Sequence, residues 1–232
     1  MAKLRVQLTK GEEIRYIGHL DYARAIERAL RRAKLPVAYT EGFNPHMKIS
    51  FASALAVGVT SRAEYVDIEF TKELTVAEFK QQLVPQLPPG IKLVAAAVVK
   101  DRGPSLTSLI NRAAYNISVP LVPDVSPETV HASIAAFNAA GSAFFVRETP
   151  KGRREINIKE YIAQPVISTL ALEKVILAVT IKLTPTGSVK PTEVLTVLVQ
   201  QFGLPAQTEA ALVEREGLYI EQEGQVLSPL SI

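Results

Sequence analysis

The sequence predicts an α+β protein built from two ferredoxin-like (βαββαβ) sandwiches in tandem, at residues 1–102 and 103–232. Three observations favour this fold class. The chain has 232 residues, a length that suits two domains of moderate size. It is 47% hydrophobic and 21% charged, which is typical of a globular protein and excludes a disordered or fibrous chain. Segments with strand and helix periods follow each other in a similar order in both halves, without residue-level identity between them.

The first half of the chain carries a clear pattern of elements. Leu4, Val6 and Leu8 alternate with polar residues, as in a half-buried strand. Apolar residues recur every three or four positions across 20–34, which predicts an amphipathic helix that ends before Pro36. The other elements predicted for this half are a short strand at 37–40, a loop at 41–46, strands at 49–57 and 64–70, a helix at 75–87 and a strand at 91–99.

The second half begins after the turn-rich segment 101–105, which we predict to join the two domains. A helix is predicted at 127–140, because Ser126 is a good N-cap and a proline fits the first helical position. Another helix is predicted at 191–202, with Gly203 just past its end. Strands are predicted at 114–119, 143–148, 156–162, 175–183 and 211–220.

The composition excludes several kinds of chemistry. The chain has no cysteine, so it has no disulfide bond, thiolate zinc site, cysteine nucleophile or cysteine-ligated iron–sulfur cluster. The three histidines His19, His46 and His131 leave little material for another metal site, and we predict neither a metal nor a cofactor. The first residues lack the apolar core of a signal peptide, and no apolar run approaches the roughly 20 residues of a membrane span. We therefore expect a cytoplasmic protein with no membrane partner.

Charge is distributed unevenly along the chain. Residues 1–48 contain ten basic and five acidic residues, whereas residues 203–232 contain one basic and five acidic residues. A basic first segment is typical of a surface that binds a polyanion. A merely solvated charged surface explains the same distribution equally well.

A stripe of arginines is the first candidate binding feature. Arg24, Arg28 and Arg31 are spaced i, i+4 and i+7 on the predicted helix, so they share one face over roughly 10 Å. The guanidinium group binds phosphate oxygens in a bidentate manner, which predicts contact with a nucleic-acid backbone. The alternative is that these arginines pair with Asp21 or Glu27 of the same helix.

Aromatic and polar residues of the neighbouring segments extend this candidate site. Tyr16, Tyr39 and Phe43 offer rings on which unpaired bases stack, unless Phe43 belongs to the core. In the second half, the arginine pair that follows Lys151-Gly suits phosphate, although an ordinary basic hairpin turn fits equally. The residues predicted to bind nucleic acid are Arg15, Arg24, Arg28, Arg31, Tyr39, Phe43, Asn44, His46, Lys48, Arg153 and Arg154.

Six segments also carry a resemblance to a known family. They are Arg15-Tyr-Ile-Gly-His-Leu-Asp21, Glu27-Arg-Ala-Leu-Arg-Arg-Ala-Lys-Leu-Pro36, Tyr39-Thr-Glu-Gly-Phe-Asn-Pro-His46, Ser50-Phe-Ala52, Lys151-Gly-Arg-Arg-Glu-Ile-Asn-Ile-Lys159 and Thr184-Pro-Thr-Gly-Ser-Val-Lys-Pro-Thr-Glu-Val-Leu195. Over nearly the whole chain the sequence resembles the bacterial radical-SAM-linked (radical-SAM-associated) family, a domain of unknown function. The resemblance implies work on RNA beside a radical-SAM enzyme. Since the chain has no cysteine, that enzyme would be a separate chain.

We therefore expect a non-enzymatic RNA-binding accessory protein, which presents tRNA or rRNA to a separate radical-SAM modification enzyme. One alternative is a metal-independent endoribonuclease similar to CRISPR RNA-processing enzymes, in which His19 and His46 would act as base and acid. Another alternative is a protein-docking module, in which the basic helix binds the partner enzyme and never contacts RNA.

Overall fold

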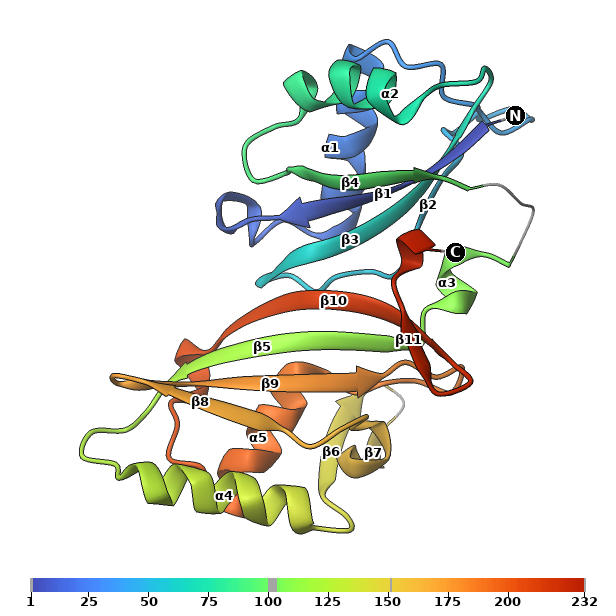
Figure 1. Cartoon of the computed structure of the whole chain (residues 1–232). Helices are drawn as coiled ribbons and strands as arrows, with labels where there is room; N and C mark the ends of the chain where they lie inside the picture. Colours follow the sequence, from blue (N-terminus) through green and yellow to red (C-terminus); the bar gives the residue numbers. More distant parts are fainter. Residues whose placement is uncertain (1, 100–103, 151, 232) are drawn as a thin grey trace. The chain divides into compact units, whose positions relative to one another are not determined.

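The structure is a computed structural model, and it describes residues 2–99, 104–150 and 152–231. The fold is mixed α+β, with few helices and mostly antiparallel strand pairs (Figure 1). The chain divides into two compact units. Unit 1 consists of Met1–Asn111 together with Gly217–Ile232, and unit 2 consists of Arg112–Glu216.

The two units differ in membership from the two predicted domains. The predicted boundary between 102 and 103, and most of the predicted junction 101–105, lie outside the described residues. Residues 104–111 and 217–231 belong to unit 1 rather than to a C-terminal domain. Unit 1 is thus made of two separate stretches of chain.

Unit 1 follows the predicted order of strand, helix, two strands, helix and strand. These elements are β1 (Ala2–Lys10), α1 (His19–Arg32), β2 (Ile49–Phe51), β3 (Val59–Phe70), α2 (Val76–Leu83) and β4 (Leu93–Val98). The strands are ordered β4-β1-β3, with β2 also paired to β3, and these three pairs are antiparallel. The unit also contains α3 (Leu106–Leu109), the end of β10 (Leu212–Gln222) and β11 (Gln225–Leu227), together with 3-10 turns at Glu12–Ile14, Val84–Gln86 and Pro229–Ser231.

The core of unit 1 lies between one face of its sheet and the two helices. Leu4, Val6 and Leu8 of β1 are fully buried, as their alternation predicted, and they belong to one cluster with Ile26 of α1 and Phe79 of α2. Because side chains alternate along a strand, the intervening residues of β1 and β3 face away from the helices. That second face carries the polar side chains discussed below.

Several predicted boundaries in unit 1 differ from the structure. The strand predicted at 37–40 is reduced to isolated bridges at Val37 and Tyr39, and the strand predicted at 49–57 ends at Phe51. The helix predicted at 75–87 ends as α2 at Leu83, with a 3-10 turn after it. Pro85 explains this end, because proline has no N–H and its ring clashes with the preceding helical turn.

Unit 2 is built from strands and two longer helices. Its elements are β5 (Arg112–Pro120), α4 (Pro127–Ala139), β6 (Phe144–Thr149), β7 (Gly152–Asn157), β8 (Ile167–Ala171), β9 (Lys174–Lys182), α5 (Pro191–Phe202) and the first residues of β10, with 3-10 turns at Ile158–Tyr161 and Thr208–Ala210. The strand order is β10-β5-β9-β8, and β6 and β7 form a separate hairpin. Within the described ranges, no helix has the length and apolar character to cross a membrane.

Both predicted helices of unit 2 are confirmed. The hydroxyl of Ser126 accepts a hydrogen bond from the backbone N–H of Thr129 at the start of α4. Gly203 follows α5 in a left-handed conformation with φ of 67°, which glycine adopts without strain. The strand predicted at 156–162 is wrong beyond Asn157, because the chain there turns into a 3-10 helix instead.

Candidate nucleic-acid interface

The arginine stripe of α1 lies on the exposed face of the helix. Tyr22, Ile26 and Leu30 bury the opposite face in the core of unit 1. Arg24 and Arg31 keep 64% and 59% of their side-chain surface exposed, and Arg28 is exposed as well. The helical period therefore places these three guanidinium groups on one outward surface, as the sequence predicted.

The ion pairs of this stripe are weak. Arg24 lies 3.3 Å from Asp21, and Arg31 lies 3.9 Å from Glu27, so the pairing considered at the sequence level does occur. Exposed pairs of this kind contribute at most about 1 kcal/mol and are screened by salt. A phosphate group can therefore displace these carboxylates at low cost.

Arg15 is not part of the exposed stripe. Its side chain is buried, its Nε donates to Glu12 over 2.8 Å, and its Nη1 donates to the carbonyl of Gly58 over 3.0 Å. The hydrogen bond from Arg15 lowers the pKa of the Glu12 carboxyl below its ordinary value. In this structure Arg15 links the turn after β1 to the start of β3, so its contacts are structural.

The segment between α1 and β2 forms a loop whose two ends are joined by hydrogen bonds. Tyr39 and Met47 form a bridge, the N–H of Thr40 donates to the carbonyl of His46 over 2.8 Å, and the N–H of His46 donates to Oγ1 of Thr40 over 3.0 Å. Met47 is buried in the same core cluster as residues of α1. The base of the loop is thus held beside α1.

The tip of this loop points into solvent. Phe43 is fully exposed, so the alternative that it belongs to the core is wrong. Tyr39 is 44% exposed, and Asn44 and His46 are exposed too. Two aromatic rings and two hydrogen-bonding side chains are therefore available to a ligand on one loop.

The other predicted aromatic and histidine residues lie near the start of α1. Tyr16 is 77% exposed. The ring of His19 packs edge-on against Phe51 with 5.0 Å between ring centroids, and its Nδ1 is buried without a hydrogen-bond partner among the described residues. No described hydrogen bond joins His19 to His46.

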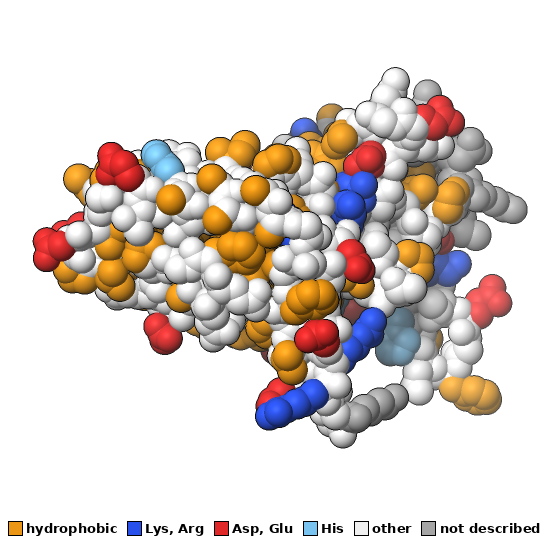
Figure 2. All heavy atoms as spheres, turned by 90° about the horizontal axis from the view of Figure 1, so that it is seen from below, with side chains coloured by type: hydrophobic (Ala, Val, Ile, Leu, Met, Phe, Trp, Pro, Cys, Tyr) orange, Lys and Arg blue, Asp and Glu red, His pale blue; other side chains and the backbone are white. Residues whose placement is uncertain are grey.

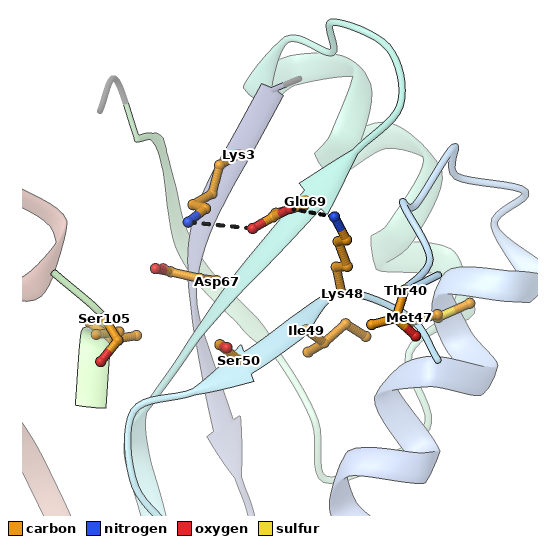
Figure 3. A pocket seen from close by; sticks show the side chains of 10 residues that line it. Lys3, Thr40, Met47, Lys48, Ile49, Ser50, Asp67, Glu69 and Ser105 are labelled. Atoms are coloured by element: carbon orange, nitrogen blue, oxygen red, sulfur yellow. Dashed lines mark ion pairs between the residues drawn. The ribbon is translucent and has the colours of Figure 1, made fainter. Parts of the chain in front are cut away.

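Lys48 lines a pocket of about 300 Å³ on the sheet face turned away from α1 and α2. Figure 3 shows the carboxylate of Glu69 between the ammonium groups of Lys3 and Lys48, which lie 3.6 and 3.7 Å from it. Below Glu69, Asp67 is held by two hydrogen bonds from Arg5, at 2.7 and 3.0 Å. The pocket is lined by Lys3, Thr40, Met47, Lys48, Ile49, Ser50, Asp67, Glu69, Ser105 and Leu106.

Lys3 and Glu69 were not predicted as site residues. The sequence does indicate that both side chains lie on the polar face of a strand, because apolar and polar residues alternate around each of them. They are also direct partners in the antiparallel pairing of β1 with β3. A single sequence does not give that register, so the two side chains could not be assigned to one site.

The basic cluster predicted in unit 2 lies on the β6–β7 hairpin. Arg153 pairs with Glu148 over 3.0 Å, and both side chains are exposed. Arg154 lies opposite Arg147 across the hairpin and is also exposed. Lys151, the first basic residue of this cluster, lies outside the described residues.

Arg147 holds this hairpin against α5, a role that the sequence did not indicate. Its Nε donates to Glu193 over 2.8 Å, its Nη2 donates to the same carboxylate over 2.6 Å, and Nη2 also donates to the carbonyl of Ser188. The hydrogen bond to Glu193 raises the pKa of the Arg147 guanidinium. Glu193 also accepts a hydrogen bond from the backbone N–H of Lys190 at the start of α5.

The helix α4 shows the opposite surface chemistry to α1. It contains no lysine or arginine, and its residues from Pro127 to Ala139 are largely alanine and other uncharged side chains. In the view of Figure 2, from below α4 in Figure 1, hydrophobic and uncharged side chains predominate over this helix. Neither His131 nor its surroundings resembles the basic stripe of unit 1.

Comparison with known proteins identifies a family and similar solved structures. A model of the family described as "Uncharacterized protein conserved in bacteria (DUF2344)" matches residues 3–191. No curated protein matches the chain. One chain of the "Crystal Structure of a Cbf5-Nop10-Gar1 Complex" is similar, with 12% identity and a TM-score of 0.47, over 94% of this chain and 47% of that chain. The "Crystal Structure of an Unknown Protein from Galdieria sulphuraria" is similar with 12% identity and a TM-score of 0.27, over 93% and 97% of the respective chains. The chain thus spans about half the length of the first of these structures.

Proposed function

The chain belongs to DUF2344, a family of uncharacterized proteins conserved in bacteria, and we propose that it is a cytoplasmic RNA-binding accessory protein. One observation carries the proposal: Arg24, Arg28 and Arg31 form an exposed stripe on α1, and the ion pairs of Arg24 with Asp21 and of Arg31 with Glu27 are exposed and weak. Guanidinium groups in a row match the repeated phosphates of a nucleic-acid strand. The exposed rings of Tyr39 and Phe43 favour RNA with unpaired bases over a plain duplex.

The proposed fold of each unit is one ferredoxin-like sandwich. In unit 1 the strand order is β4-β1-β3-β2, and in unit 2 it is β10-β5-β9-β8. Both orders support the βαββαβ arrangement, provided that the β6–β7 hairpin is counted as an insertion after α4. In unit 1 this arrangement puts α1 on the outside of the sheet with its polar face toward solvent.

The protein is proposed to present its bound RNA, a tRNA or an rRNA, as substrate to a separate radical-SAM modification enzyme. This part of the proposal is supported by the motif resemblance alone, over segments such as 15–21 and 39–46. The absence of cysteine assigns the iron–sulfur chemistry to the partner chain. The same exposed stripe would also suit an acidic surface of that partner, so a test must separate RNA from protein.

The test is RNA binding across a salt titration, with purified protein and total tRNA or rRNA fragments. We expect the double variant Arg24→Ala/Arg28→Ala to bind more weakly. It should also reduce the slope of log K against log salt by about 1.5, because two phosphate contacts are lost. A matched control is Lys80→Ala/Lys92→Ala, which removes the same charge from exposed positions of unit 1 outside α1.

Three outcomes are informative. If the slope of log K against log salt is reduced in the arginine variant but not in the lysine control, the stripe binds RNA. Equal slopes in wild type, arginine variant and lysine control would overturn the RNA-binding proposal. If RNA does not bind at low salt but a radical-SAM protein co-purifies after nuclease treatment, the stripe is a protein-docking surface instead.

A further inference from the structure

The pocket beside β2 has the chemistry of a ribonucleotide site. We propose that it binds one ribonucleotide, with the phosphate on Lys3 and Lys48 and the ribose hydroxyls on Glu69. Its volume of about 300 Å³ is at the lower end of the range of small-ligand pockets. The pocket lies on the opposite face of the sheet from α1, so it is a separate site from the arginine stripe.

Two lysines provide the cationic part of the site. Lys3 comes from β1 and Lys48 lies directly before β2, and their ammonium groups converge on one carboxylate from opposite sides (Figure 3). Both lie more than 3.5 Å from Glu69, which is longer than a hydrogen bond, and about a third of each side chain is exposed. Two cations thus share one anion, and their N–H donors can turn to a phosphate without breaking a close contact.

Glu69 is the carboxylate of the pocket that can bind a ligand. Asp67 is already occupied by two hydrogen bonds from Arg5, whose Nη1 also donates to the carbonyl of Pro229. Glu69 keeps a third of its side chain exposed, and its carboxylate forms two long ion pairs, with Lys3 and Lys48. A carboxylate in this position accepts hydrogen bonds from ribose hydroxyls, as acidic residues do in dinucleotide-binding proteins. The 2′-hydroxyl is also the group that distinguishes RNA from DNA.

The remaining walls suit a nucleobase. Ser50 lies on the same face of the sheet as Asp67, its partner in β3, and Thr40, Ser105 and Leu106 also line the pocket, whereas the side chain of Ile49 packs on the core side with Ile68. A hydroxyl donates and accepts, so that of Ser50 fits the polar edge of any base, and the aliphatic side chain of Leu106 can pack against its ring. The pocket thus offers a group for each of the three parts of a ribonucleotide.

The ribonucleotide has two possible sources, a free mononucleotide or one nucleotide of a bound strand. The second source rests on the proposed RNA-binding function. The loop 39–47 connects the two surfaces, because Met47 belongs both to the pocket lining and to the core cluster of α1. The first source is independent of α1.

The test titrates the full chain by calorimetry with AMP, GMP, CMP and UMP, their 2′-deoxy counterparts and inorganic phosphate. A second arm compares an RNA decamer with the DNA decamer of the same sequence. We expect Lys48→Gln to weaken ribonucleotide binding about tenfold, because one charge-assisted contact to phosphate is lost. Glu69→Ala should abolish the preference for ribose over deoxyribose without weakening phosphate binding, because a repelling carboxylate is removed. The matched controls are Lys80→Gln and Glu73→Ala, exposed residues of unit 1 that do not line the pocket.

The proposal is supported if wild type prefers ribose over deoxyribose, with mononucleotides or with decamers, and Glu69→Ala removes this preference. The arm that shows the preference identifies the source of the ribonucleotide. The proposal is overturned if wild type shows a ribose preference in neither arm. It is also overturned if the pocket variants bind like the control variants. The two proposals fail separately. If mononucleotides bind but RNA does not, the pocket proposal stands and the proposed RNA-binding function is wrong. If RNA binding depends on Arg24 and Arg28 but is unchanged in the pocket variants, the RNA-binding function stands and the pocket proposal is wrong.

Discussion

Arg15 and Arg24 come from the same basic segment, yet burial gives them different roles. Arg15 is 5% exposed and donates to Glu12 and to the carbonyl of Gly58, whereas Arg24 is exposed with one weak ion pair. We expect Arg15→Ala to lower the free energy of unfolding by about 2 kcal/mol, because a buried side chain and its hydrogen bonds to Glu12 and Gly58 are lost. Arg24→Ala should change it by less than about 0.5 kcal/mol. Urea unfolding of both variants measures the difference, and equal midpoints would contradict this assignment.

The pH dependence of Glu12 provides a control for the Arg15 prediction. The pKa of Glu12 is lowered in the folded state, chiefly by the hydrogen bond from Arg15, so its charged form stabilises the fold. That contribution is present above the unfolded pKa of about 4.5 and is lost as the pH falls through the lowered folded pKa. Glu12→Gln should therefore be less stable than wild type at neutral pH, with the difference shrinking below pH 4.5. In an Arg15→Ala background the pH-dependent difference should disappear.

At the scale of elements, an ion pair links the β6–β7 hairpin to α5, beside a hydrogen bond from Gln201 of α5 to the carbonyl of Phe144. Arg147 donates twice to Glu193, and Glu193 is only 6% exposed. We expect Arg147→Ala to cost about 2–3 kcal/mol, because it leaves a buried carboxylate without its cation. Arg153→Ala is the control on the same hairpin, where the exposed pair with Glu148 is worth less than about 1 kcal/mol.

Urea unfolding compares the two variants, and amide hydrogen exchange of the hairpin reports whether it loosens locally. Arg147→Lys should fall between wild type and Arg147→Ala, because lysine keeps the charge but not the two-pronged hydrogen bond. The interpretation is wrong if Arg147→Ala and Arg153→Ala unfold at the same midpoint.

The elements also show what a single sequence can predict. The helix α5 was predicted at its exact bounds because a proline starts it and Gly203 ends it, and such signals are local. The strand β8 was missed because it has only five residues, none of them charged, and lacks a strong alternation of apolar and polar side chains. Likewise, counting charges overstated the basic surface, since Arg5, Lys10 and Arg15 are all buried. Burial and register depend on contacts between distant segments, which sequence periodicity does not contain.

At the scale of the whole molecule, unit 1 needs both of its stretches of chain. Asn111 donates its N–H to the carbonyl of Tyr219, and its side chain exchanges two hydrogen bonds with the backbone of Glu221. The carbonyl of Pro229 accepts a hydrogen bond from the buried Arg5. The predicted domain 1–102 omits all of these contacts and would leave Arg5 without one of its partners.

We therefore expect residues 1–111 alone to lack a cooperative unfolding transition. A chain in which a short glycine–serine linker joins Asn111 directly to Gly217 should restore it, because the linker replaces unit 2 and keeps both stretches of unit 1 together. Urea unfolding followed by circular dichroism measures both chains, and Arg5→Ala in the joined chain should lower its midpoint, since the buried Asp67 then loses its cation. If residues 1–111 alone unfold cooperatively at the same midpoint as the joined chain, the C-terminal stretch is dispensable and unit 1 is a contiguous domain after all.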